Sequence, residues 1–375
     1  MLQHIDGQSF RLSRFKHIYV LAAGKSAAIM AQKTESILGD SITDGVIVTK
    51  YGHGADLKYL KLIEAGHPIP DEEGVKGTRI MLDIARQSSE YDLVICLISG
   101  GASALMADFP EGSTLRDLKL ANELLVKCGA DITEINTVRK HLSNVKGGQL
   151  AKTLYPATTV CIILSDVIGD RPDIIASGPT VGDPTTFADA WAVIKKYSLE
   201  NAFPPSMLNH LQKGSAGFIP ETPKPEDVIF RNVHNFIIGN NRLALEGSSR
   251  KALQLGFEPH IITDKLKGET IEIADFILKE IEKTQQAVGK KPVCLLFGGE
   301  PTVKVSGTGL GGRNQHLALY LSTKIDVEKE IAILCAGTDG TDGPTDAAGA
   351  VIDNKTMATA TMKNINPQSF LQNQE

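Results

Sequence analysis

Short apolar runs rich in Val, Ile and Leu alternate with longer amphipathic stretches, and this alternation limits the fold more than any other feature. Runs that are apolar at consecutive positions are typical of parallel strands covered on both faces. Strands that alternate with helices predict an α/β fold, here with three layers. The expected strands are HIYVLA (17–22), GVIVTK (45–50), LKLIEAG (60–66), DLVICLI (92–98) and TTVCIIL (158–164).

Chain length and a cluster of prolines indicate two domains. The 375 residues exceed what one ordinary core needs and are enough for two α/β domains. Between residues 200 and 232, prolines gather with charges and few apolar residues, which is typical of a linker or a surface excursion. A second series of strand-like runs follows. We therefore expect domains at 1–230 and 231–375.

Composition excludes several classes of partner. A formal net charge of −5 offers no broad positive surface to nucleic acid or to an anionic membrane. Five isolated cysteines without a CxxC pair indicate reduced thiols rather than disulfides or a zinc site. No apolar segment approaches the roughly 18 residues of a membrane span, and the start lacks a signal-peptide pattern. We expect a cytoplasmic protein, as a monomer or homodimer.

The segment YVLAAGKSAAIM (19–30) places Gly24, Lys25 and Ser26 between a predicted strand and a predicted helix. The first glycine of a P-loop would fall on Tyr19, so the loop is too short to wrap phosphates in that way. A helix start at the carboxyl edge of a sheet is nevertheless where ligands bind in such folds. Lys25 is either a phosphate ligand or a solvated charge, and the small alanines around it favour the ligand.

The segment LISGGASALM (97–106) repeats this arrangement after another buried strand. Tandem glycines let a ligand approach the backbone closely, so the loop offers backbone N–H groups and two hydroxyls. The alternative is a tight turn without a ligand. The candidate contact residues are Ser99, Gly100, Gly101 and Ser103.

Two long polar loops carry carboxylates. Residues 163–191 contain the end of a buried strand and the long loop after it, and Asp166 lies just after that strand. Long loops in this position are usually functional. Residues 336–350 place Asp339 and Asp342 among glycines, which suits a hard cation such as Mg²⁺ without matching the EF-hand spacing. Any one of these acids could instead cap a turn.

The segment GGEPTVKVSGTGLGGRNQ (298–315) contains G-x-G-x-x-G at 307–312, which is the dinucleotide-binding fingerprint. Such a site needs an acid at the end of the next strand to hold the ribose, and the next run, IAILCA, supplies none. We expect instead a glycine loop that contacts an anion and ends in an arginine. Its candidate residues are Glu300, Gly309, Gly311, Gly312, Arg313 and Asn314.

A basic stretch, NTVRKHLSNVKGGQLA (136–151), carries Arg139, Lys140 and Lys146 on a predicted helix that stops at Gly147. Most basic helical runs are solvated faces. Together with the loops above, this one could bind a carboxylate.

These parts match what phosphoryl transfer needs, because Lys, Arg and Mg²⁺ supply most of its catalysis through positioning and charge neutralisation. The chain also resembles the glycerate 2-kinase family, the class II glycerate kinases, in motifs that follow the family's order from about residue 18 to 353. The matching motifs are AAGKSAAIMA, AGHPIPDEEG, LISGGASALM, INTVRKHLSNVKGGQLA, LSDVIGDRPDIIASGPTVGDPTTFADA, GGEPTVKVSGTGLGGRNQ and AGTDGTDGPTDAAGAVID.

The resemblance implies a Rossmann-like N-terminal domain that faces a smaller C-terminal MOFRL domain across an active-site cleft. The implied reaction converts ATP and D-glycerate into ADP and 2-phosphoglycerate with Mg²⁺. The family's lysine and arginine fall on Lys25 and Arg313, which would stabilise phosphate charge. Its S-D-V acid falls on Asp166, which would orient or deprotonate the attacking hydroxyl.

The chain departs from the family at both ends. Relatives begin with an additional helical segment and continue, after the point where this chain stops, into a segment with a T-G-P-T-x-T-N-like motif. We therefore expect an incomplete C-terminal domain.

Two other functions remain open from the sequence. One is an NAD(P)-dependent reductase of hydroxypyruvate or tartronate semialdehyde, which would need the missing ribose acid. The other is a catalytically degenerate protein that binds a nucleotide or a sugar acid. The choice of the 2-hydroxyl over the 3-hydroxyl rests on the family resemblance alone.

Overall fold

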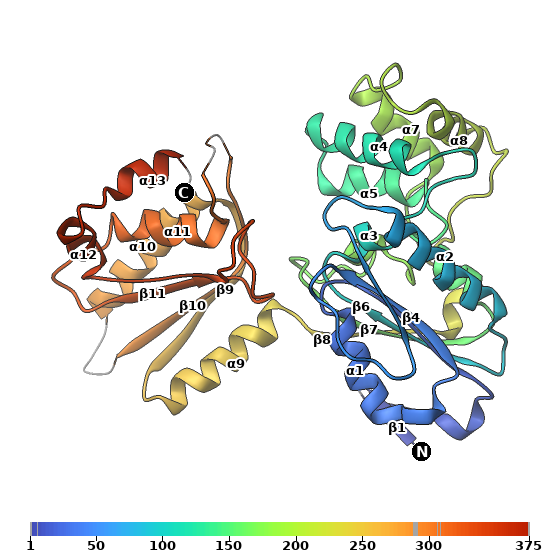
Figure 1. The fold of residues 1–375 in the computed structure, drawn as a ribbon, viewed down its shortest axis with the longest axis horizontal. Helices are drawn as coiled ribbons and strands as arrows, with labels where there is room; N and C mark the ends of the chain where they lie inside the picture. Colours follow the sequence, from blue (N-terminus) through green and yellow to red (C-terminus); the bar gives the residue numbers. More distant parts are fainter. Residues whose placement is uncertain (1, 6, 288–291, 306, 308, 374–375) are drawn as a thin grey trace. The chain divides into compact units, whose positions relative to one another are not determined.

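The computed structural model describes residues 2–5, 7–287, 292–305, 307 and 309–373 (Figure 1). The chain folds into two compact units, Met1–Asn240 and Asn241–Glu375, each of which is described by itself below. Within the described ranges, no helix has the length and apolar character needed to cross a bilayer.

The first unit is built on a six-stranded sheet in which every neighbouring pair is parallel. Its spatial order is β5-β4-β3-β6-β7-β8, so the strands follow the 3-2-1-4-5-6 order of a Rossmann sheet. The order reverses between β3 and β6, and ligands of such folds bind at that point. The strands are β3 (Ile18–Ala23), β4 (Asp44–Lys50), β5 (Lys61–Ala65), β6 (Leu93–Ile98), β7 (Thr158–Leu164) and β8 (Val233–Gly239).

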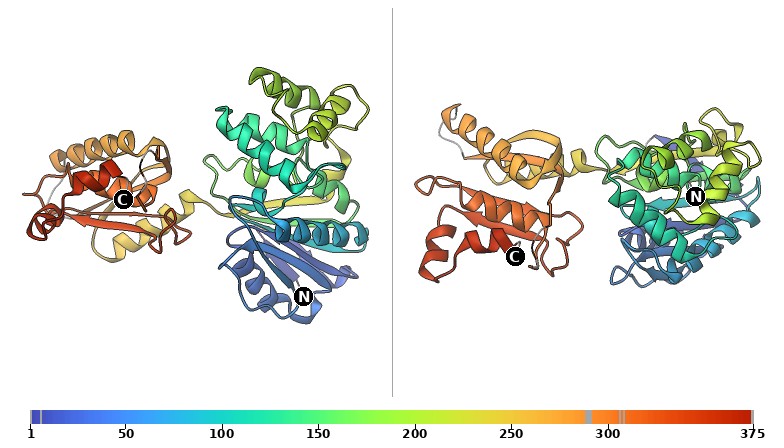
Figure 2. Two further views of the ribbon diagram at one scale, coloured as in Figure 1. Left: turned by 45° about the horizontal axis from the view of Figure 1, so that its top comes forward. Right: turned by 90° about the horizontal axis from the view of Figure 1, so that it is seen from above.

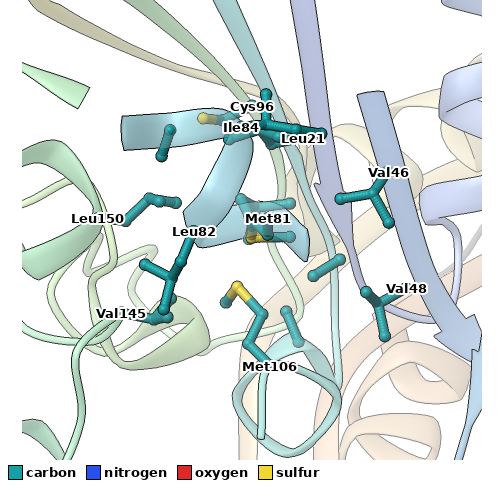
Figure 3. Packing of buried hydrophobic residues seen from close by; sticks show 14 of the residues in the cluster. Leu21, Val46, Val48, Met81, Leu82, Ile84, Cys96, Met106, Val145 and Leu150 are labelled. Carbon is teal, nitrogen blue, oxygen red and sulfur yellow. The ribbon is translucent and has the colours of Figure 1, made fainter. Parts of the chain in front are cut away.

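Apolar residues on both faces of these strands explain the layers. On one face, Val20 packs in a cluster with the small alanines at the start of α1 (Ala27–Leu38). On the other face, Leu21 packs in a cluster with Met81 and other residues of α2 (Glu72–Gln87) (Figure 3). The five predicted strands and the three-layer α/β architecture are therefore confirmed.

A group of four helices forms a separate hydrophobic cluster in the first unit (green in Figure 1). The helix α8 lies in the proline-rich segment that was predicted to be a linker or a surface excursion, and the linker alternative is wrong. Pro205 occupies the first helical position, where a missing N–H costs nothing, and Met207 and Leu211 are buried in the cluster. The helices are α4 (Leu115–Lys127), α5 (Ile132–Lys140), α7 (Phe187–Lys196) and α8 (Pro205–Ser215).

The boundary of the first unit also differs from the predicted one. The strand β8 was assigned to the second domain, but it pairs with β7, from Thr159 opposite Val233 to Leu164 opposite Gly239. Sheet pairing therefore extends the first unit to Asn240 rather than to residue 230. The unit also contains a hairpin of β1 (Leu2–Ile5) and β2 (Gln8–Arg11), and the short helices α3 (Ala102–Leu105) and α6 (Gln149–Leu154).

The second unit is an α/β unit with two small sheets (Figure 2). The strand β9 (Glu258–Glu269) is parallel to β10 (Val293–Thr302), and β11 (Ala332–Ala336) is antiparallel to β12 (Gly349–Asp353). Its core includes Ile273, Leu317 and Ile352. The helices are α9 (Asn241–Gln254), α10 (Thr270–Ala287), α11 (Arg313–Ser322), α12 (Thr356–Met362) and α13 (Pro367–Asn373).

All five cysteines carry free thiols, as predicted. Burial raises the pKa of Cys161 and of Cys335 to about 12, and it raises the pKa of Cys96 as well. Because the thiolate is the reactive form, these thiols are unreactive at neutral pH.

Candidate functional site

The loops that follow β3 and β6 are joined by backbone hydrogen bonds at the point where the strand order reverses. The amide of Lys25 donates to the carbonyl of Gly100 at 2.9 Å, and the amide of Ser26 donates to Ser99 Oγ at 3.0 Å. The sheet therefore places the lysine turn directly beside the tandem-glycine loop. These two segments lie about 75 residues apart in the chain and were predicted independently.

Gly24 is required for this close approach. Its φ is +131°, and a Cβ atom at this position would overlap the hydroxyl and the carbonyl of Ser99. Only glycine combines this φ with the absence of a side chain. The structure shows that Gly24 permits the contact between the two loops. Its predicted contact with a ligand stays a prediction.

Asp166, at the end of β7, brings a carboxylate to the same edge of the sheet. A Cβ atom on Gly100 would overlap this carboxylate, so the acid lies against the glycine backbone. The residue is exposed to solvent. The neighbouring Ser165 fixes the loop, because its amide donates to the carbonyl of Gly239 at 2.8 Å. Three of the predicted segments thus converge within one unit.

His67 is a further group at this edge that was not predicted from the sequence. A Cβ atom on Gly101 would lie 2.8 Å from His67 Nε2 and 3.5 Å from the Cγ atom of Lys25. His67 follows β5, and the carboxyl ends of all parallel strands meet at one edge. Its position directly after a predicted strand was the signal that could have found it.

The hydroxyls of Ser99 and Ser103 form hydrogen bonds within the protein. Ser99 Oγ accepts the amide of Ser26, and Ser103 Oγ forms a 2.8 Å hydrogen bond with Ser177 Oγ. A role for these hydroxyls in ligand binding stays a prediction. The amides of Gly100 and Gly101, in contrast, have no hydrogen-bond partner among the residues that the structure describes. Backbone amides in such glycine loops are typical anion ligands.

In the second unit, Arg313 and Glu300 form an ion pair. Arg313 is the first residue of α11, and its Nη1 atom donates to Glu300 Oε1 at 2.8 Å. The side chains remain 43% and 54% exposed, so the pair adds little to stability. Two predicted site residues are thus brought together, with a guanidinium that solvent reaches.

The start of α11 is capped by Asp342, one of the two acids predicted to bind Mg²⁺. Both carboxylate oxygens accept hydrogen bonds, from the amides of Asn314 at 3.0 Å and Gln315 at 2.8 Å and from both amide side chains. Asp342 is only 1% exposed. Asp342 therefore caps this helix, and Asn314 uses its backbone and side-chain amides within the protein. A ligand role for either residue stays a prediction.

The glycine loop before α11 packs closely against other parts of the second unit. The amide of Gly309 donates to the carbonyl of Asn373 at 3.1 Å, and a Cβ atom on Gly312 would overlap the Asp342 carboxylate. A Cβ atom on Gly343 would likewise overlap the carbonyl of Gly311, so these two backbone segments pack closely. The glycine loop that was expected to contact an anion therefore uses part of its backbone in contacts within the protein. Positions 306 and 308 of the loop lie outside the described residues.

Asp339 differs from Asp342 although both belong to the same pattern. Asp339 is exposed, and its Oδ1 atom accepts the amide of Thr341 at 3.3 Å. No cluster of three or more potential metal ligands occurs among the residues described. Of the two acids predicted to bind Mg²⁺, only Asp339 keeps a carboxylate that solvent reaches.

Replacing Asp342 by Ala is expected to lower the free energy of unfolding by about 1–2 kcal/mol, because α11 loses its cap. Chemical denaturation of the purified chain measures this loss. Asp346→Ala is the matched control, since Asp346 is an exposed acid of the same loop. If Asp342→Ala kept full stability and instead shifted a Mg²⁺ dependence, Asp342 would be a metal ligand rather than a cap.

Two family models match the chain. The first, described as a domain of unknown function, DUF4147, matches residues 2–212, and the second, described as the MOFRL family, matches residues 293–375.

Individual proteins match over almost the whole chain. A glycerate 2-kinase from Pyrococcus horikoshii is 46% identical over 98% of this chain and 82% of its own length. A crystal structure of glycerate kinase from Thermotoga maritima superposes with a TM-score of 0.84 at 41% identity, over 96% of this chain and 85% of that one. A protein from Agrobacterium vitis with a provisional hydroxypyruvate reductase name is 37% identical, over 94% of this chain and 79% of its own length.

Proposed function

The chain belongs to the family of glycerate kinases with a C-terminal MOFRL domain, and on this premise we propose that it transfers the γ-phosphoryl group of ATP to the 2-hydroxyl of D-glycerate with Mg²⁺. The observation that carries the proposal is the convergence of Lys25, the Gly100–Gly101 amides and Asp166 at one edge of the Rossmann sheet. These groups supply positive charge, hydrogen-bond donors and a carboxylate, which phosphoryl transfer requires.

In this mechanism Asp166 accepts the proton of the attacking hydroxyl. The hydroxyl oxygen forms a bond to the γ-phosphorus while the bond from that phosphorus to the oxygen of ADP breaks. The Asp166 carboxylate suits this role because it is exposed and lies against Gly100, where no side chain separates it from a ligand. The proton ends on the carboxylate and passes to solvent.

Lys25 and the amides of Gly100 and Gly101 would hold the phosphate oxygens. Charge on these oxygens grows in the transition state, and fixed donors that face it lower the barrier. Arg313 would supply a second positive group, which Glu300 holds in position through the 2.8 Å ion pair. A Mg²⁺ ion would neutralise phosphate charge, and the exposed carboxylate of Asp339 is chemically suited to it.

The reductase function is less well supported by the fold. A dinucleotide in a Rossmann sheet needs a glycine-rich first turn and an acid near the end of the second strand. Here the first turn has a single glycine followed by Lys25, and the second strand, β4, ends in Thr49 and Lys50. The order of the strands is therefore compatible with a dinucleotide. The residues at the edge of the sheet, which include Lys25 and lack an acid for the ribose, favour the phosphates of ATP instead.

An ADP-release assay with D-glycerate, ATP and Mg²⁺ tests the proposed function. We expect ADP to form only when D-glycerate is present. Oxidation of NADH with hydroxypyruvate, without ADP release, would instead establish the reductase. Nucleotide binding without turnover would establish the catalytically degenerate binding protein.

Replacing Gly100 by Ala is expected to lower turnover by about 10- to 100-fold, because the new methyl group overlaps the Asp166 carboxylate and displaces it. Steady-state kinetics measures the effect. Gly247→Ala, in the middle of α9, is the matched control, since the nearest atom to its new methyl group is in a flexible arginine side chain 3.8 Å away. Normal turnover in a folded Gly100→Ala variant would show that the position of Asp166 does not matter.

A further inference from the structure

A cavity of about 70 Å³ in the first unit adjoins the edge described above. Two segments connect it to that edge. Pro68 follows His67, and Ser103 comes two residues after Gly101. The helices α3, α4 and α5 line the cavity with residues that include Ala104, Asn122 and Arg139. Ser143 and Lys146, in the segment after α5, complete this side of the lining.

Arg139, on α5, brings an uncompensated positive charge to this cavity. Its Nε atom donates to Asn122 Oδ1 at 2.8 Å, and no carboxylate within the described part of the chain forms an ion pair with it. Burial lowers the pKa of the Arg139 guanidinium. The group stays charged at neutral pH, since an arginine pKa remains far above it. A charge in such surroundings is costly unless an anion accompanies it.

The other charges of the cavity are already balanced. Lys146 Nζ donates to the carbonyl of Met106 at 2.7 Å and lies 3.3 Å from the Asp108 carboxylate. Asp108 also accepts Ser143 Oγ at 2.6 Å. The charges of Lys146 and Asp108 cancel, and the charge of Arg139 remains. Burial lowers the pKa of Lys146, and the positive charge of the nearby Arg139 lowers it further.

We propose that this cavity binds the carboxylate end of the acceptor substrate, a small hydroxy acid, with Arg139 as its ion-pair partner. The proposal rests on the proposed kinase function, because it assigns the acceptor subsite of that site. A water molecule needs roughly 10–15 Å³ of such volume, so the cavity holds the equivalent of about five waters. A three-carbon acid that also reaches toward the Gly101 loop is of matching size. Guanidinium forks bind carboxylates through two parallel hydrogen bonds.

Replacing Arg139 by Gln tests the assignment. With ATP saturating, we expect the KM for D-glycerate to rise by about 10- to 100-fold, because a charge-assisted hydrogen bond is lost. The KM for ATP should change by less than about twofold, since the ligand affected is the acceptor. Arg139→Lys should recover part of the loss. Arg116→Gln, an exposed arginine on the neighbouring α4, is the matched control and should leave both constants unchanged.

Calorimetric titration without nucleotide separates this proposal from the kinase function. We expect D-glycerate to bind wild type but not Arg139→Gln, and glycerol, which lacks the carboxylate, to bind neither. Ala104→Leu, which fills the cavity while keeping its charges, should also abolish binding and serves if Arg139→Gln does not fold.

If the wild type is active and a folded Arg139→Gln or Ala104→Leu variant has an unchanged KM for D-glycerate, the subsite is overturned and the kinase function stands. Binding of D-glycerate that depends on Arg139, in a chain that releases no ADP, would uphold the subsite and overturn the kinase. Failure of D-glycerate to bind wild type and to be turned over would overturn both.

Discussion

Replacing Asp166 by Asn is expected to lower turnover by at least about 100-fold, because the amide has the shape of the acid but cannot accept the proton of the attacking hydroxyl. The carboxylate lies against the Gly100 backbone at the edge where the Lys25 turn meets the glycine loop. The variant should fold normally, since Asp166 is exposed. Steady-state ADP release at saturating ATP and D-glycerate measures the effect.

Asp83→Asn is the control for this experiment. Asp83 is an exposed acid of α2 in the same unit, and its replacement should leave turnover unchanged. A folded Asp166→Asn enzyme with nearly wild-type turnover would end the assignment of Asp166 as the base, and His67 would then be the next candidate at this edge.

Replacing Lys25 by Met is expected to lower kcat/KM by about 1,000-fold or more, because phosphoryl transfer depends on positive charge held against the phosphate oxygens. Methionine has an unbranched side chain that is one atom shorter than that of lysine, and it carries no charge. The half-buried Lys25 lies at the start of α1, and its own amide is held by the Gly100 carbonyl, so its backbone should not move. Kinetics over a range of ATP concentrations gives the loss.

Lys33→Met is the matched control, since Lys33 is an exposed lysine of the same helix. Lys25→Arg should retain more activity than Lys25→Met, because the charge is kept. Equal activity of Lys25→Met and Lys33→Met would show that Lys25 is a solvated charge, which was the alternative left open by the sequence.

The fold of the first unit could be predicted because its strands are apolar on both faces. In β4, for example, Val46, Ile47 and Val48 are all fully buried, which only a doubly covered sheet requires. The helix α8 could not be predicted in the same way. A proline at its first position is compatible with a helix start and with a linker, and only the burial of Met207 decides between them.

The site was predictable in its parts and not in its assembly. Lys25 and Asp166 each follow a predicted strand, which is a local signal. Their proximity depends on β6 lying between β3 and β7, and this order is set by long-range packing that no local pattern records. Asp339 and Asp342 show the same limit. They are alike in sequence, yet only Asp342 is buried as the cap of α11.

The most direct test of the central claim is the phosphorus NMR spectrum of the product formed from ATP and D-glycerate. We predict 2-phosphoglycerate, whose phosphorus couples to the single proton of a secondary carbon and gives a doublet. A triplet from the two protons of a primary carbon would identify 3-phosphoglycerate and contradict the assigned position. A spectrum without any phosphoglycerate, from a chain that binds both substrates, would contradict the kinase function itself.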